Sequence, residues 1–165
     1  MTVKEFVEKY KTLDEDGKLE LIMDIINNNY VSYATKVSDC NKIIQATSYI
    51  GTDPKMFKIN SPSRYMLLNL QLIIRYTNLE IKQDGEAMME AYDILDEIDA
   101  LTNILACIPS KEMISYNHIM KMMLKDLQMN ERSIIGYIDT KLASLNIIGD
   151  ALNKFLEENS DLDES

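Results

Sequence analysis

Apolar residues recur every three or four positions along most of the chain, which is the spacing of one face of an α-helix. The first such run begins after Thr2, whose spacing to Glu5 is that of a capping box, and it ends at Tyr10. A turn at residues 14–17 separates it from a second helix that extends to Ile26. Ser32 is suited to cap a third helix. The inner face expected for that helix consists of Ala34, Val37, Cys40, Ile44 and Thr47.

The helical pattern is interrupted once, over residues 49–63, where Gly51, Pro54 and Pro62 supply breaks. This passage predicts a short irregular arm near residues 50–60, with a strand or extended piece at 56–59. Ser61 then predicts the cap of a fourth helix, with Pro62 at its first position. That helix, over about residues 62–81, is the most apolar of all, so we expect it to lie centrally.

After Gly85 the pattern predicts a helix that runs towards Ile108 and stops at Pro109, with a break near Asp99. A further helix begins at Ser110, and another break is expected near residue 130. Beyond it lies a heptad seam that either packs on the domain's own core or pairs with a second subunit. The seam consists of Ile138, Leu142, Leu145, Gly149, Leu152 and Leu156. The predicted fold is therefore all-α, a single-domain helical bundle of six or seven helices over residues 1–158, followed by an acidic flexible tail over 159–165.

The charge balance limits the kinds of partner. With 27 acidic and 17 basic residues the formal net charge is −10, which argues against duplex DNA or an anionic membrane, because both are bound through Lys and Arg. Residues 31–75 are locally basic, with six bases and two acids. Cys40 and Cys107 are isolated and predict free thiols in a reducing compartment. The N-terminus has no secretory pattern and no apolar run approaches the roughly 20 residues of a membrane span, so a cytoplasmic protein is expected.

The sharpest local feature is a row of carboxylates, the acidic stripe, formed by Glu86, Glu90, Asp93 and Glu97. Spacings of four, three and four place these side chains on one side of a helix, where like charges repel. Three interpretations are open at this point. The stripe is a solvated helix face, or it recognises a basic protein partner, or Glu90 and Asp93 form one half of a magnesium site in a nucleotide hydrolase.

The metal interpretation is the weakest of the three. A second helix has to supply the facing carboxylates, and residues 110–125 offer only Glu112. A di-iron site needs a Glu-x-x-His motif on two helices, and the chain has a single histidine, His118. We therefore expect no metal, no cofactor and no catalytic residue.

Methionines gather on the helix that begins at Ser110, including Met120 and Met123. Flexible thioether side chains either fill gaps in a core or adapt to a partner on an exposed surface. Met120 and Met123 are therefore candidate partner-binding residues, in addition to those of the acidic stripe.

Three segments resemble a family of small proteins carried by phages and prophages of low-GC Gram-positive bacteria. They are TVKEFVEKY at 2–10, INSPSRYMLL at 59–68 and NERSIIGYIDTKL at 130–142. The resemblance implies a phage-encoded protein that acts inside a bacterial host cell, and it implies no activity. The predicted function is a non-enzymatic module that engages or inhibits a host defence protein or nucleic-acid enzyme with a basic surface. Alternatives are a virion assembly protein, for example a homodimer formed through the C-terminal helices, and an all-α magnesium-dependent nucleotide hydrolase.

Overall fold

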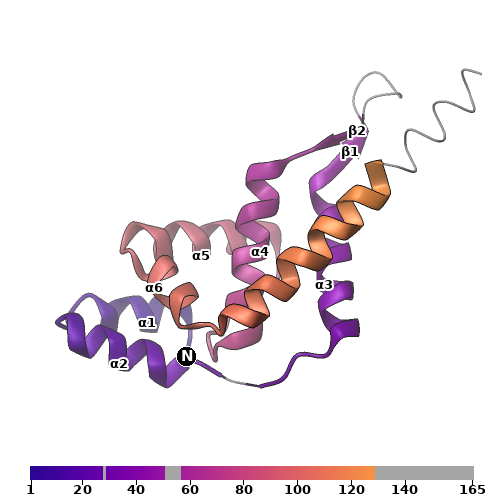
Figure 1. The fold of residues 1–165 in the computed structure, drawn as a ribbon. Helices are drawn as coiled ribbons and strands as arrows, with labels where there is room; N and C mark the ends of the chain where they lie inside the picture. The colour runs from indigo at the N-terminus through magenta and orange to yellow at the C-terminus, as the bar shows by residue number, and fades with distance from the viewer. Residues whose placement is uncertain (28, 51–56, 129–165) are drawn as a thin grey trace, which may run out of the picture. The chain divides into compact units, whose positions relative to one another are not determined.

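The computed structural model describes residues 1–27, 29–50 and 57–128. Contacts divide the chain into two units, Met1–Leu124 and Lys125–Ser165. Of the second unit only residues 125–128 are described, and they are helical. The account below concerns the first unit, in which the described residues form seven helices and one small hairpin (Figure 1).

The first two helices are short and are both capped by side chains. α1 (Val3–Tyr10) begins with the capping box predicted from Thr2 and Glu5, and both hydrogen bonds of that box are present. α2 (Glu15–Ile25) is capped by Asp14, which accepts from the backbone N–H of Gly17. Residues 15–17 therefore form its first turn, because an acidic cap and two further acids favour a helix N-terminus. The prediction of a separate turn at 14–17 is wrong.

α3 (Tyr33–Thr47) begins at the predicted cap Ser32 and passes directly into the irregular arm. The arm contains two strands, β1 (Ser48–Ile50) and β2 (Phe57–Ile59), which pair antiparallel with Ser48 opposite Ile59. α4 (Ser61–Tyr76) follows, and its cap is Asn60 rather than Ser61, which is the first helical residue. It ends five residues before the predicted limit. The chain then extends so that Thr77 bridges to Ile26 and Glu80 bridges to Thr2.

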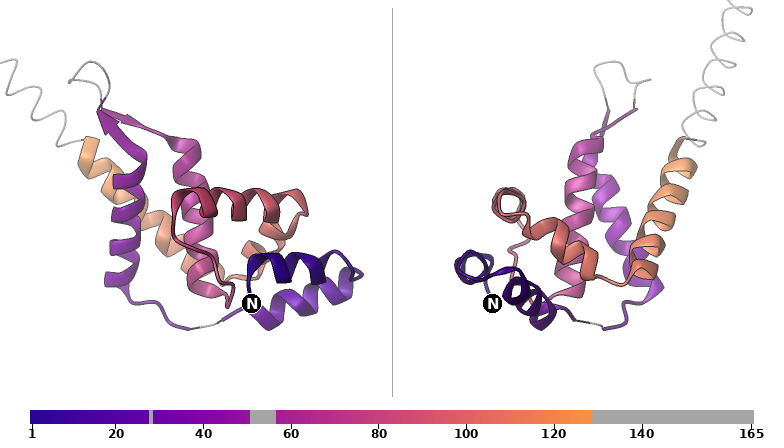
Figure 2. Two further views of the ribbon diagram at one scale, coloured as in Figure 1. Left: turned by 180° about the vertical axis from the view of Figure 1, so that it is seen from behind. Right: turned by 60° about the vertical axis from the view of Figure 1, so that its left-hand side comes forward.

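The second half of the unit consists of α5 (Gly85–Glu97), α6 (Ala100–Cys107) and a helix over residues 110–128. The break predicted near Asp99 is confirmed: this residue adopts the left-handed conformation, with φ of 58°, between α5 and α6. Pro109 ends α6, also as predicted. Figure 2 shows that α1, α2, α5 and α6 gather on one side of α4, while α3 and the helical residues 110–124 lie on the other.

α4 is central, as its apolar composition predicts. It contacts α3, α5 and α6, and Leu70, Leu72 and Ile73 are fully or almost fully buried. One continuous core joins α4 to α1, α2, α5 and α6. That core is formed by Val3, Phe6, Val7, Tyr10, Ile22, Ile25, Ile73, Leu79, Ala91, Leu95, Ala100, Leu101 and Ile104.

Two predicted faces are placed differently by the structure. On α3 the buried face is Lys36, Asp39, Cys40, Ile43, Ile44 and Thr47. Ala34 is exposed, because the buried face of α3 includes Lys36 and Asp39 and is rotated away from Ala34. On α2 the apolar pattern is wider than the covered surface, so Ile22 is buried while Leu19 and Met23 are 55% and 56% exposed.

The prediction of an all-α helical bundle with one short arm is confirmed. Within the described residues no helix is both long and apolar enough to cross a bilayer. The domain limit at residue 158, the tail over 159–165, the break near residue 130 and the heptad seam all lie outside the described residues.

Candidate functional site

All four carboxylates of the acidic stripe are exposed on α5. The opposite side of this helix packs into the core through Ala91 and Leu95, which fixes the stripe outward. Glu86 lies in the first turn, where the helix dipole favours an acid, whereas Glu97 is the last residue of the helix and no base occupies the last turn. Repulsion along the stripe and the dipole at Glu97 both cost stability, and a basic partner would relieve both.

A groove of about 320 Å³ runs beside the stripe, between α5, the start of α1 and the segment around Ile81. Its apolar lining consists of Val3, Ile81, Ala87, Ala91 and Ile94. The small side chains of Ala87 and Ala91 leave the surface of α5 hollow. Of the stripe residues Glu90 lines the groove, and the other polar residues of the lining include Lys4, Lys82 and Glu80.

An ion pair between α1 and α5 lies at the edge of the groove. The Lys4 Nζ atom lies 3.3 Å from Glu90 Oε1, and both side chains are more than half exposed. An ion pair of this kind contributes at most about 1 kcal/mol, because water screens it. Glu90 therefore accepts an ammonium group at low cost and exchanges it readily for another.

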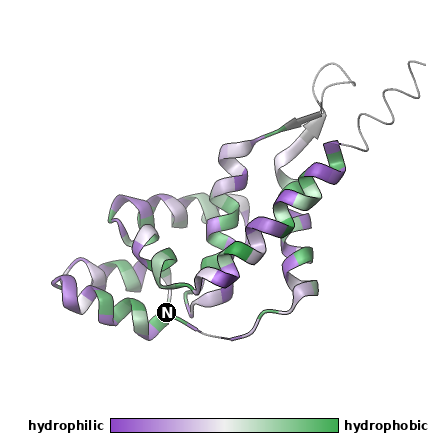
Figure 3. Cartoon of the chain, viewed as in Figure 1, coloured by the Kyte–Doolittle hydropathy of each residue, from purple (hydrophilic) through white to green (hydrophobic). Residues whose placement is uncertain are grey.

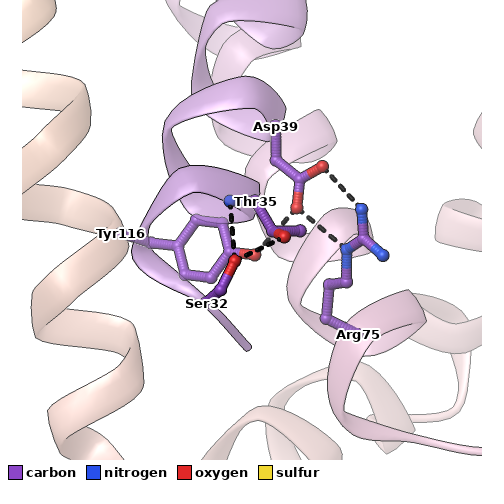
Figure 4. A network of polar contacts seen from close by, with 5 residues as sticks. All are labelled: Ser32, Thr35, Asp39, Arg75 and Tyr116. Atoms are coloured by element: carbon purple, nitrogen blue, oxygen red, sulfur yellow. Dashed lines mark hydrogen bonds and ion pairs between the residues drawn. The ribbon is translucent and has the colours of Figure 1, made fainter. Parts of the chain in front are cut away.

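A second polar cluster, the interhelical network, is buried where α3, α4 and the helix over 110–128 meet. Asp39 lies at its centre and is 3% exposed. Its carboxylate accepts two hydrogen bonds from the Arg75 guanidinium, of 2.8 and 2.9 Å, and one of 2.9 Å from the Tyr116 hydroxyl (Figure 4). Figure 4 also shows the Ser32 cap of α3, whose hydroxyl is 2.8 Å from that of Thr35.

The other half of the network joins the same three helices. The Lys36 ammonium pairs with the Glu112 carboxylate, which also accepts from the Tyr76 hydroxyl. The side chains of Lys36 and Glu112 are 7% and 9% exposed. The rings of Tyr76 and Tyr116 meet edge to face with centroids 6.5 Å apart, so the two halves contact each other.

The pKa values in the network follow from these partners. The ammonium of Lys36, followed by the hydroxyl of Tyr76, lowers the pKa of Glu112. Burial alone would raise the pKa of Asp39, but the hydrogen bonds from Arg75 and Tyr116 outweigh it and the pKa is lowered. Both carboxyls are therefore ionised near neutral pH, and burial together with these carboxylates raises the pKa of both tyrosines.

The network is electrically balanced, with two cations and two anions that satisfy one another. Such an arrangement fixes the register of three helices, because each partner loses its counter-ion if a helix shifts. A pocket of about 190 Å³ bordered by Tyr30 and Pro109 reaches the Tyr76–Glu112 pair. Nearby, burial raises the pKa of the Cys40 thiol to about 11, so this cysteine is not an activated nucleophile.

The structure separates the two candidate methionines. Met120 is buried at 5% exposure and packs in the interior, so its prediction as part of an exposed binding strip is wrong. Met123 is partly exposed. His118 is exposed as well, which agrees with a surface histidine.

The magnesium hypothesis needs a second acidic group close to Glu90 and Asp93. Among the described residues no three His, Cys, Asp or Glu side chains come together in a way that could hold a metal ion. Glu90 pairs with Lys4, and Glu112, the one acid within residues 110–125, pairs with Lys36.

Protein-family models, curated proteins and solved structures were all compared with this chain, and none matches it. The candidate site therefore depends on the geometry described above.

The interhelical network was not recognised in the sequence. Lys36 and Arg75 belong to the locally basic segment over residues 31–75, and Glu112 is the one acid of residues 110–125, so neither pattern indicates a buried pair. A usable signal was present, since Lys36, Cys40, Ile43 and Thr47 are spaced by four, three and four on α3. A lysine in an otherwise apolar row predicts a buried charge with a partner, but the partner's identity depends on how the helices pack.

Proposed function

We propose that this chain is a phage-encoded, non-enzymatic binding module that engages a host protein through the acidic stripe and the groove beside it. The observation that carries the proposal is that a row of four exposed carboxylates on α5 meets a largely apolar groove at Glu90. A partner segment that combines aliphatic and basic side chains fits both parts at once. A host defence protein or a nucleic-acid enzyme with a Lys- and Arg-rich surface has this chemistry.

The charges and the groove have different roles in this proposal. The stripe raises the rate of encounter with a basic surface and selects against acidic ones. The groove supplies burial of apolar area, which is the larger source of affinity in most protein interfaces. In the free protein Lys4 occupies the position beside Glu90 that a cationic side chain of the partner takes in the complex.

The virion-assembly alternative depends on the heptad seam, which lies outside the described residues. The hydrolase alternative requires a second carboxylate group facing α5. We therefore place binding first.

The test begins with affinity capture from infected cells and identification of the captured protein by mass spectrometry. Binding of the purified pair is then measured for a chain in which Glu86, Glu90, Asp93 and Glu97 are all replaced by lysine. We expect the affinity to fall by more than about a hundredfold, because each like-charge contact costs several kcal/mol.

A matched pair of variants separates local recognition from net charge. Glu86→Gln with Asp93→Asn removes two stripe charges, and Glu8→Gln with Asp126→Asn removes two exposed charges elsewhere. The first pair should weaken binding several-fold and make it less sensitive to salt, and the second should leave it nearly unchanged. Equal effects of the two pairs, or unchanged binding after reversal of all four stripe charges, would refute the proposal.

A further inference from the structure

α2 carries a second surface with the chemistry of a docking site, on a different helix from the stripe. Leu19 and Met23 are four residues apart and are 55% and 56% exposed. Both belong to the apolar pattern of the helix, yet the core takes only Ile22 and Ile25. Figure 3 shows apolar and polar residues interspersed along α2. Single exposed apolar residues are common, but two adjacent ones on one helix face form a contiguous patch.

A row of acids flanks this patch on one side. Asp16, Glu20 and Asp24 follow one another at intervals of four residues, which makes an acidic row next to the Leu19–Met23 row. The same five residues line a shallow depression on the outer side of the helix, and none of them is basic. The surface is therefore apolar along one edge and negatively charged along the other.

We infer that the α2 surface, made of Asp16, Leu19, Glu20, Met23 and Asp24, docks an amphipathic helix of a partner protein. The occupant carries aliphatic residues that cover Leu19 and Met23, and Lys or Arg residues on the flank that faces the acids. Helix pairing of this kind needs apolar contacts at i and i+4 on both sides, which Leu19 and Met23 provide. The row of acids sets the orientation and the register of the partner helix, because it attracts the Lys and Arg residues on one flank of that helix.

Charge decides between this occupant and others. A second copy of α2 would bring three acids against the same three acids, which disfavours self-association through this surface. An anionic membrane or a nucleic acid would also be repelled. A basic amphipathic helix gains from both rows at once.

The test uses the full chain with the acidic stripe neutralised by Glu86→Gln, Glu90→Gln, Asp93→Asn and Glu97→Gln, so that the stripe does not compete for the probe. The probe is a synthetic amphipathic helical peptide with leucines on one face and lysines on the other. Amide chemical shifts of the isotope-labelled chain are followed during a titration. We expect saturable shifts that are centred on residues 16–24. A peptide in which serines replace the leucines should bind at least about tenfold more weakly, because only charge attraction remains.

Leu19→Ser with Met23→Ser should also reduce the affinity for the Leu–Lys peptide by about tenfold or more. Ile114→Ser with Met122→Ser is the matched control, since it removes two exposed apolar side chains from another helix. Circular dichroism establishes that each variant is folded. Should the serine pair on α2 unfold the chain, Asp16→Asn, Glu20→Gln and Asp24→Asn together provide the second variant, and they should remove most of the salt dependence.

The inference is overturned if the shifts cluster away from α2, if the α2 and control variants bind equally, or if the serine peptide binds as well as the leucine peptide. A concentration-dependent dimer that Leu19→Ser abolishes would also overturn it, in favour of a second copy as the occupant. Neutralisation of the acidic stripe on α5 should leave peptide binding at α2 intact, so failure of the proposed function and failure of this inference can be told apart.

Discussion

Replacement of Lys36 by methionine tests whether the interhelical network holds the helices of this protein in register. Methionine keeps much of the length of the lysine stem but removes its charge. The Glu112 carboxylate is 9% exposed in its side chain and would then keep only the hydrogen bond from Tyr76. An uncompensated buried charge of this kind costs about 3–5 kcal/mol. We expect the free energy of unfolding to fall by that amount near neutral pH.

A second substitution, Glu112→Leu, and the pH dependence show whether lost charge pairing causes the destabilisation by Lys36→Met. With Lys36→Met and Glu112→Leu combined, neither charge of this pair is left in the interior, so most of the lost stability should return. The ordinary glutamate pKa is 4.5, and in the wild-type protein the pKa of Glu112 is lowered. The ion pair therefore stabilises the fold above pH 4.5 and loses its contribution as the pH falls through the lowered pKa. In the Lys36→Met variant the carboxyl is protonated more easily, so the deficit should shrink as the solution is acidified.

Denaturant unfolding followed by helical circular dichroism measures all four members of this cycle at two pH values. The reasoning is refuted if Lys36→Met costs less than about 1 kcal/mol, which is the value of a surface pair. It is also refuted if the double variant is no more stable than the single one. A deficit that is independent of pH would show that loss of packing, rather than of charge pairing, is responsible.

Three further predictions concern the rest of the fold. Leu95→Ala should lower the free energy of unfolding by about 2–5 kcal/mol, because this side chain is completely buried; thermal and denaturant unfolding measure the loss, and a value below about 1 kcal/mol would mean that α5 is not packed as described. Thr2→Ala removes the capping box of α1 and should cost about 1 kcal/mol in the same assay, whereas Thr12→Ala, outside the cap, should cost less. Iodoacetamide should label Cys107 before Cys40 in the folded protein, because Cys40 is buried with a pKa of about 11, and equal rates of labelling by mass spectrometry would contradict this.

The two polar features of this molecule differ in how they are built. The acidic stripe comes from one helix, and its geometry follows from the periodicity of that helix alone. The interhelical network comes from three segments, with a sequence separation of 36 between Asp39 and Arg75 and of 77 between Asp39 and Tyr116. Its members are satisfied by one another, which is typical of a structural element, whereas the stripe and the α2 surface present charged and apolar groups to solvent, where a partner can reach them.

The sequence by itself determined the helices, most of their caps and the central place of α4. It also determined that the four stripe carboxylates share one side of α5, because hydrogen bonding and side-chain periodicity within a helix are local properties. Only the tertiary structure decided that Lys36, Asp39 and Glu112 are buried while Leu19 and Met23 are exposed. Periodicity states which residues share a face, but the neighbouring helices decide which face is covered. A buried charge is compatible with a stable fold only when packing places its partner next to it.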